Sequence, residues 1–81
     1  MNDDIMYLNQ LQIGQNARIK QLTCEGNIRR RMMELGLIPN TSVEALQKSP
    51  SGDPTAYYIR GAVIALRSEE ASKIIVKIGC C

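Results

Sequence analysis

The chain has 81 residues, enough for one small domain but not for two. It contains no histidine, which excludes a Ser-His-Asp triad, a Cys-His pair and a histidine-rich metal site. The formal net charge of +2 is too small to favour nucleic acid or an acidic membrane as partner, and no apolar run approaches the roughly 20 residues that cross a bilayer.

The start of the chain, Met1-Asn2-Asp3-Asp4, is acidic and lacks the basic-then-apolar layout of a secretory signal. We interpret residues 1–6 as a flexible leader to a single domain that spans 1–81. Leu8 and Leu11 are spaced like one helical turn. Residues 16–23 interleave polar and apolar side chains, which predicts a strand with Ile19 facing inward.

Residues 26–36 predict the one substantial helix. Ile28, Met32 and Leu35 recur at positions i, i+4 and i+7, which places them on one stripe. A helix this short is marginal in isolation, so we expect the stripe to be docked on the rest of the domain.

Glycine and proline mark the turns that follow. Gly36 stands where a left-handed C-terminal cap is needed, and Pro39 follows at the usual distance. Residues 49–54 are rich in turn formers. Gly61 predicts a tight turn, because glycine adopts positive φ without steric cost.

Strands are predicted over 42–48, 56–60, 62–67 and 74–78. The 62–67 strand is apolar on both faces, so we expect it to be central in the sheet. Ser68 followed by two acids predicts a short helix before the last strand. The fold class is therefore mainly β: a small five-stranded barrel with one substantial helix after the first strand and a short helix before the last.

Arg29, Arg30 and Arg31 form the densest charge cluster. One interpretation is a solvated helix face whose alkyl stems cover apolar surface. The functional interpretation is a docking patch for an acidic protein surface, and phosphate binding ranks third because no glycine-rich loop precedes the helix. Met32 and Met33 point about 100° apart, so one can fill the core while the other remains an adaptable contact for a partner.

Three cysteines invite a metal-binding hypothesis. Thiolates are good ligands for soft metals, but Cys80 and Cys81 are adjacent and do not have the Cys-x-x-Cys spacing of zinc or redox sites. Cys24 could add a third ligand only if the fold brings it near. The other interpretation is a flexible tail over 79–81 with two ordinary thiols, and the odd cysteine count favours a reducing, cytoplasmic location.

Catalytic groups are scarce in this sequence. The carboxylates are scattered, and no two of them are arranged as an acid/base pair. Three tyrosines also make a poor platform for stacking bases. We therefore expect a domain that binds a partner and is not an enzyme.

The stretch from Arg29 to Asn40, with basic residues, two large apolar residues, Leu-Gly, an apolar residue and Pro, resembles the central motif of the ferrous iron transport protein A (FeoA) family. A second match covers Ile59–Arg67, and the Asp53-Pro54 loop also fits. The similarity extends from about Leu8 to Ile78. The resemblance implies an SH3-like five-stranded barrel, with Gly36, Pro39 and Gly61 as structural motif positions.

The resemblance also implies a cytoplasmic accessory protein of bacterial ferrous iron uptake. Its partner would be FeoB, a membrane transporter with a cytoplasmic GTPase domain, and assisting transporter assembly or modulating the GTPase are both open. We expect the helix to make the contact through Arg29, Arg31 and Met33, with Met32 and Leu35 bracing it from beneath, although the two methionines could be reversed.

Two alternatives are kept open. The first is a transition-metal-binding protein, with iron as the ion and Cys24, Cys80 and Cys81 as ligands, although no cofactor is expected firmly. The second is a regulatory SH3-like interaction module, because similar domains end the iron-dependent repressors. This chain has no DNA-reading helix pair before its first strand, so we expect no binding to DNA. The oligomeric state is not indicated by the sequence.

Overall fold

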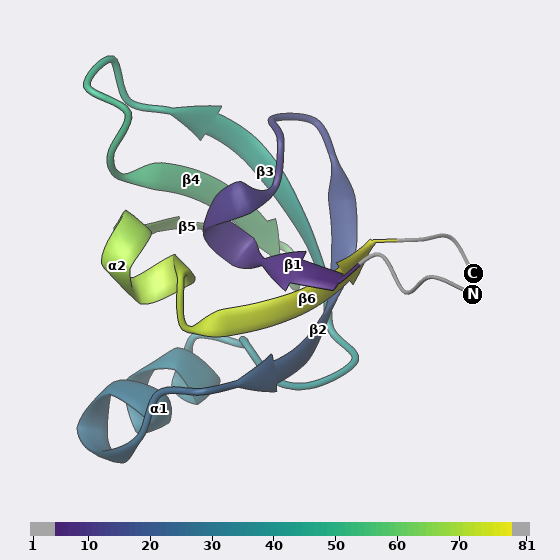
Figure 1. The fold of residues 1–81 in the computed structure, drawn as a ribbon, viewed down its shortest axis with the longest axis vertical. Helices are drawn as coiled ribbons and strands as arrows, with labels where there is room; N and C mark the ends of the chain where they lie inside the picture. Colours follow the sequence, from purple (N-terminus) through teal and green to yellow (C-terminus); the bar gives the residue numbers. More distant parts are fainter. Residues whose placement is uncertain (1–4, 79–81) are drawn as a thin grey trace.

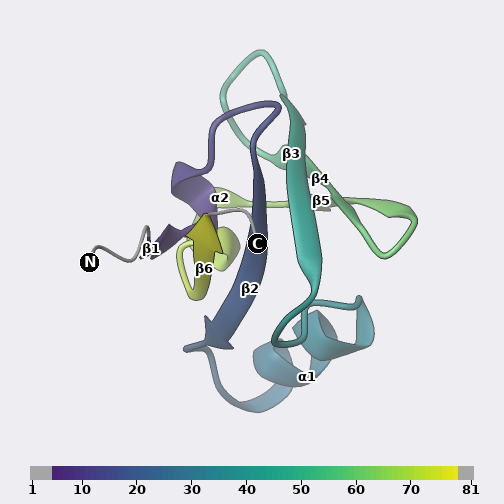
Figure 2. The ribbon, with the colours of Figure 1, turned by 90° about the vertical axis from the view of Figure 1, so that its right-hand side faces the viewer.

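Six short antiparallel strands build one strongly curled sheet in the computed structural model, which describes residues 5–78 (Figures 1 and 2). The strands follow the order β1-β6-β2-β3-β4-β5 across the sheet. Their bounds are β1 (Ile5–Tyr7), β2 (Asn16–Leu22), β3 (Ser42–Lys48), β4 (Thr55–Ile59), β5 (Ala62–Leu66) and β6 (Ile74–Ile78). The helices are a 3₁₀ turn η1 (Leu8–Gln10), α1 (Gly26–Glu34) and the single turn α2 (Ser68–Ala71).

The mainly β class is confirmed, but the expectation of five strands closed into a barrel is wrong in detail. Ile5 and Met6, expected to belong to the flexible leader over 1–6, instead lie in a sixth strand, β1, in which Met6 pairs with Val76 of β6. As a result, α1 follows the second strand, and the sheet is open with β1 and β5 at its two ends. The expected flexible tail over 79–81 lies outside the described residues.

The expected central position of the 62–67 strand is also wrong. β5 pairs only with β4 and forms an edge of the sheet, with Val63 65% exposed. Ala62 and Ala65 are exposed too. Apolar residues on both faces therefore do not reflect burial on both faces in this strand.

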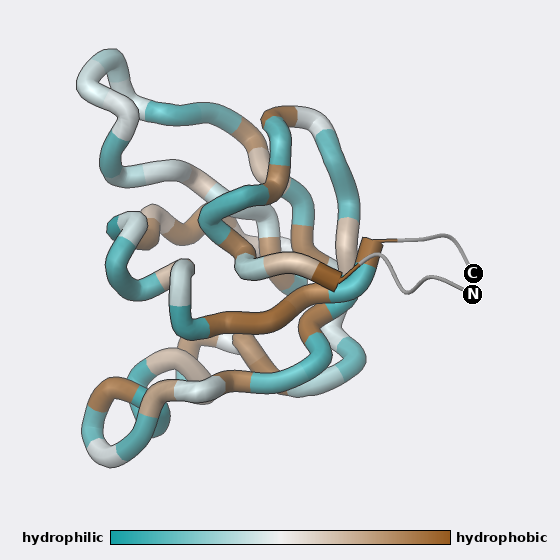
Figure 3. The backbone as a smooth tube through the Cα atoms, in the orientation of Figure 1, coloured by the Kyte–Doolittle hydropathy of each residue, from teal (hydrophilic) through white to brown (hydrophobic). Residues whose placement is uncertain are grey.

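The core is mostly aliphatic, in a chain without Phe or Trp, but the aromatic ring of Tyr57 is also buried in it. Figure 3 shows hydrophobic residues concentrated along β6, whereas the loop between β3 and β4 is neutral to hydrophilic. The expected stripe on α1 is only partly buried: Met32 is fully buried, but Ile28 is 50% and Leu35 36% exposed. The reason lies in the placement of α1, which packs at one end of the sheet near β2 and β3 and not broadside on a face (Figure 2).

The end of α1 is a Schellman motif. Gly36 has φ +104°, and its N–H donates to the Met33 carbonyl at 3.0 Å. The N–H of Leu37 donates to the Met32 carbonyl at 3.0 Å, and both side chains are fully buried. The predicted cap at Gly36 is confirmed. The motif turns the chain so that Met32 in the last turn of the helix and Leu37 directly after the glycine both enter the core.

Replacing Gly36 with alanine is expected to lower the free energy of unfolding by about 2 kcal/mol, and Gly52→Ala by about 1 kcal/mol. Both glycines have strongly positive φ, +104° and +92°. A Cβ at Gly36 would also lie 3.1 Å from Cδ of Arg60, whereas nothing lies within 4 Å of one at Gly52. Urea unfolding of the two variants measures the difference, and equal losses would contradict a special role for the α1 cap.

Two adjacent tyrosines on β4 face opposite ways, as alternation predicts. Tyr57 is 2% and Tyr58 45% exposed. The Tyr57 hydroxyl donates to the Leu8 carbonyl at 3.4 Å, which ties β4 to η1. Burial raises the pKa of Tyr57 above its usual value near 10, and the charge of Asp53 adds to the rise, against an opposing hydrogen bond with Thr55.

We expect the Tyr57→Phe variant to lose less free energy of unfolding than the parent when the pH becomes alkaline. The raised pKa means that the folded protein keeps the phenol protonated when the unfolded chain ionises. This contribution to stability is therefore complete below pH 10 and is lost as the pH rises through the folded-state pKa. Urea unfolding at pH 7 and pH 11 should show the parent losing more stability than the variant, and an equal loss would contradict the inference.

Candidate partner-binding surface on helix α1

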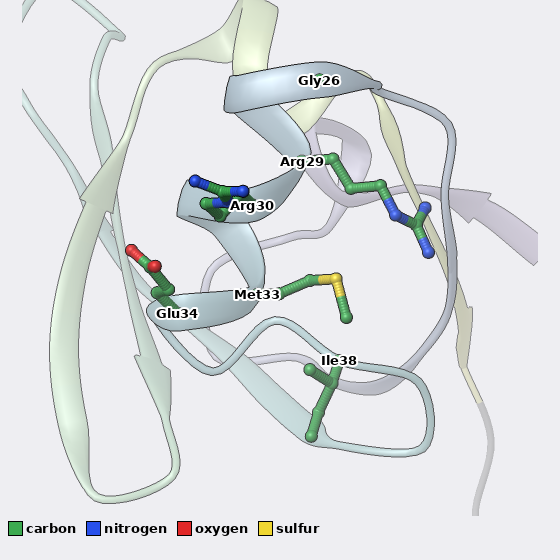
Figure 4. A pocket seen from close by; sticks show the side chains of 6 residues that line it. All are labelled: Gly26, Arg29, Arg30, Met33, Glu34 and Ile38. Atoms are coloured by element: carbon green, nitrogen blue, oxygen red, sulfur yellow. The ribbon is translucent and has the colours of Figure 1, made fainter.

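A shallow open hollow of about 470 Å³ lies along one side of α1. Its lining residues come from the helix and from the loop that follows it (Figure 4). They are Gly26, Arg29, Arg30, Met33, Glu34 and Ile38.

The floor of the hollow is apolar. Met32 enters the core, and Met33, one residue and about 100° further round the helix, emerges with 40% of its surface exposed. The Schellman turn brings Ile38 back beneath the helix, and Figure 4 shows its half-buried side chain close to that of Met33. Ile28 and Leu35 are exposed on the same short helix and its cap, so α1 carries more apolar surface than its docking uses.

Two arginines stand at the rim. Arg29 extends from the same side of the helix as Met33, and its Nη1 donates to the Leu22 carbonyl at 3.2 Å, which fixes the side chain against the end of β2. The Arg30 side chain forms no hydrogen bond or ion pair within residues 5–78. The lining thus offers one anchored arginine and one that is unpaired within the described residues around an apolar floor, together with the exposed carboxylate of Glu34.

Arg31 belongs to a different contact. Its Nη2 lies 2.5 Å from Oε2 of Glu70, and this ion pair connects α1 to α2. The other oxygen of Glu70 accepts the N–H of Arg67 at 3.0 Å, at the start of α2. The spacing on the helix would also allow Arg30 and Arg31 to pair with Glu34, but neither pair forms in the described chain.

The structure places the residues singled out in the sequence in different settings. It brings Arg29 and Met33 together in the hollow and puts Met32 beneath it. Leu35, expected to brace the helix from beneath, is more than a third exposed because it caps the helix above the Schellman turn.

Gly26, Glu34 and Ile38 line the hollow but were not expected there, and Arg30 was considered only as part of the arginine cluster. Arg30 lies three residues before Met33, and this i, i+3 spacing could have placed both on one face. Ile38 follows the helix, and no local pattern predicts how far the chain turns back after Gly36. Only the fold brings it under Met33.

No metal centre is visible in the described part of the chain. Cys24 is a free thiol, 5% exposed, and residues 5–78 contain no group of three His, Cys, Asp or Glu side chains that could hold an ion. Cys80 and Cys81 lie outside the described residues, so a site involving them stays a prediction. No helix within residues 5–78 has the length and apolar character that a membrane crossing needs.

Comparison with known proteins identifies relatives across most of the chain. Residues 6–78 match the model of the FeoA domain. The chain is 33% identical over 73 residues to a protein of Porphyromonas gingivalis named as an Fe(2+) transport protein A/Fe(2+) transporter FeoB fusion, covering 90% of this chain but 9% of that one.

Solved structures show the same fold. The solution structure of iron(II) transport protein A from Clostridium thermocellum is 36% identical, has a TM-score of 0.87, and matches over 90% of this chain and 45% of that one. The zinc complex of FeoA from Stenotrophomonas maltophilia, described as an SH3-domain protein, is 29% identical with a TM-score of 0.78, over 88% of each chain.

Proposed function

The chain belongs to the FeoA family, and from this premise we propose that it is a non-enzymatic accessory protein of ferrous iron transport that binds the cytoplasmic part of a FeoB-type transporter through α1. The proposal places the protein on the cytoplasmic side of the membrane. Iron would be the cargo of the transporter and not a resident group of this domain.

The hollow on α1 is the observation that carries the proposal. An exposed methionine above a half-buried isoleucine, flanked by Arg29 and Arg30, is typical of a contact surface, because methionine adapts its shape and arginine is enriched in interfaces. The fusion in Porphyromonas gingivalis supports the choice of partner. Joining two proteins in one chain raises their effective concentration for each other, which is useful when the two work together.

The chemistry of the hollow indicates what part of the partner would fit it. The apolar floor would take a side chain such as leucine, and a carboxylate next to that side chain would lie against Arg30. We therefore expect α1 to bind an acidic segment with an exposed apolar residue. This expectation also agrees with the Arg30 side chain having no ion-pair partner within residues 5–78.

Isothermal titration of the full chain against the cytoplasmic part of a FeoB-type transporter from the same genome tests the proposal. The titration is run without nucleotide, with GDP and with a non-hydrolysable GTP analogue, each with and without Fe(II). Saturable binding in at least one state supports the proposal, and no binding in any state would overturn it. Measuring the GTP hydrolysis rate with and without the chain then separates action on the GTPase from action on assembly.

A further inference from the structure

The outer edge of β5 is a second candidate surface, because within the described residues β5 pairs with no strand other than β4. β4 and β5 are joined by the two-residue turn Arg60-Gly61, and both residues have positive φ, 51° and 84°. That is the conformation of a type I′ turn, and it confirms the turn predicted at Gly61. The turn fixes which backbone groups of β5 face β4 and which face away.

The alternation of the ladder identifies the outward groups. In a two-residue hairpin the residues that flank the turn, here Ile59 and Ala62, form a hydrogen-bonded pair. The next pair, Tyr58 and Val63, is then not hydrogen-bonded. Val63 and, two residues further, Ala65 therefore direct their N–H and C=O groups away from β4. No strand in the described sheet pairs with that side.

The edge lacks the usual protection against pairing. Natural edge strands carry lysine, proline or a bulge that blocks the addition of another strand. β5 reads Ala-Val-Ile-Ala-Leu, and its register with β4 is regular over all five residues. Val63 is 65% exposed beside Tyr58, which is 45% exposed, so apolar surface continues from the edge onto the outer face of the sheet.

The charged residues at the two ends of β5 indicate which kind of segment would pair with its edge. Within residues 55–67 the only charged side chains are Arg60 and Arg67, one at each end of β5. A second copy paired symmetrically about Ile64 would bring Arg67 of each copy opposite Gly61 of the other, next to its Arg60. Like charges would meet at both ends, which disfavours a dimer and favours a segment with acidic ends.

We propose that the edge of β5 binds an extended peptide segment with an apolar centre and acidic ends, which adds to the sheet as a seventh strand. The backbone of Val63 and Ala65 supplies the hydrogen bonds. Val63 and Tyr58 supply the apolar contact, and Arg60 and Arg67 receive the carboxylates. This surface is separate from the hollow on α1, and the proposal does not depend on the transporter being the partner.

A synthetic peptide, acetyl-Glu-Thr-Val-Thr-Val-Glu-amide, is the probe for the full chain labelled with ¹⁵N. We expect saturable shifts of the Val63 and Ala65 amides at peptide concentrations on the order of 1 mM. Exchange of those amides should be about fourfold slower at three-quarters saturation. The same peptide with lysine in place of glutamate should bind about tenfold more weakly.

Two variants isolate the backbone contribution. Val63→Pro removes one outward N–H and leaves the hydrogen bonds between β4 and β5 intact, whereas Val63→Thr keeps both shape and N–H. The threonine variant should bind like the parent and the proline variant at least about fivefold more weakly.

Three outcomes would overturn the proposal. They are the absence of peptide shifts at β5, equal binding of the acidic and basic peptides, and amide shifts at β5 that depend on protein concentration alone, which would assign the edge to a second copy. The peptide comparison uses the unaltered chain, so it decides even if the proline variant fails to fold.

Discussion

Met33→Ala is expected to weaken binding to the cytoplasmic part of a FeoB-type transporter by at least about tenfold, with the fold unchanged. Met33 is the exposed half of the apolar floor, and truncating an interface residue that fills a pocket removes both its contact and its exclusion of water. Ile13→Ala is the matched control, because Ile13 is 48% exposed but does not line the hollow. We expect the control to change the Kd less than twofold. Titration calorimetry of both variants measures the difference.

The arginines provide an independent test of the same surface. Arg30→Ala should weaken binding about threefold, because Arg30 lies at the rim and has no partner of its own within residues 5–78. Arg31→Ala removes the ion pair with Glu70 instead, so its effect on affinity should be smaller. If Met33→Ala and Ile13→Ala bind alike, or if Arg31 matters more than Arg30, the contact surface lies elsewhere on the chain.

Strands that are flanked by clear turn-forming residues, or that consist of a β-branched run, could be predicted from the sequence. The bounds expected for β3 and β6, 42–48 and 74–78, are those observed. Proline and glycine clusters flank the first, and a β-branched run defines the second. The cap at Gly36 was equally predictable, because left-handed backbone after a helix selects glycine.

The docking of α1 could not be predicted in the same way. The spacing of Ile28, Met32 and Leu35 indicates which residues share a stripe, but it does not say how much of the stripe touches the sheet. The helix packs at the end of the sheet, so only Met32 is buried. Ile28 and Leu35, expected on the docked stripe, become exposed apolar surface, and this exposure is one reason why we propose α1 as the contact surface.

The two edges of the sheet show a related limit. Ile5–Tyr7 is too short to be recognised without its partner, and it becomes a strand because β6 offers a free edge. β5 looked central because its apolar residues occupy both faces, yet alanine and valine are small enough to remain exposed. Position within a sheet depends on pairing over long distances in the chain, which local composition does not encode.

The second large effect concerns the stability of the fold. Met32→Ala is expected to lower the free energy of unfolding by about 2–5 kcal/mol, because Met32 is fully buried and alanine would leave a cavity. A chain of this size is stabilised by about 4–12 kcal/mol in total, so the variant would lose a large fraction. The melting temperature should fall by at least about 10 °C.

Met33→Ala is the matched control, since it removes the same atoms one position further along α1. With 40% of its surface exposed, Met33 should contribute less than about 1 kcal/mol. The adjacent variants then separate two roles: Met32 holds α1 and the Leu37 turn to the core, and Met33 is the residue that we propose contacts the partner. Urea unfolding of both variants measures the contrast. If both cost the same, α1 would not be held by a single buried residue, and the surface assigned to Met33 would be part of the fold.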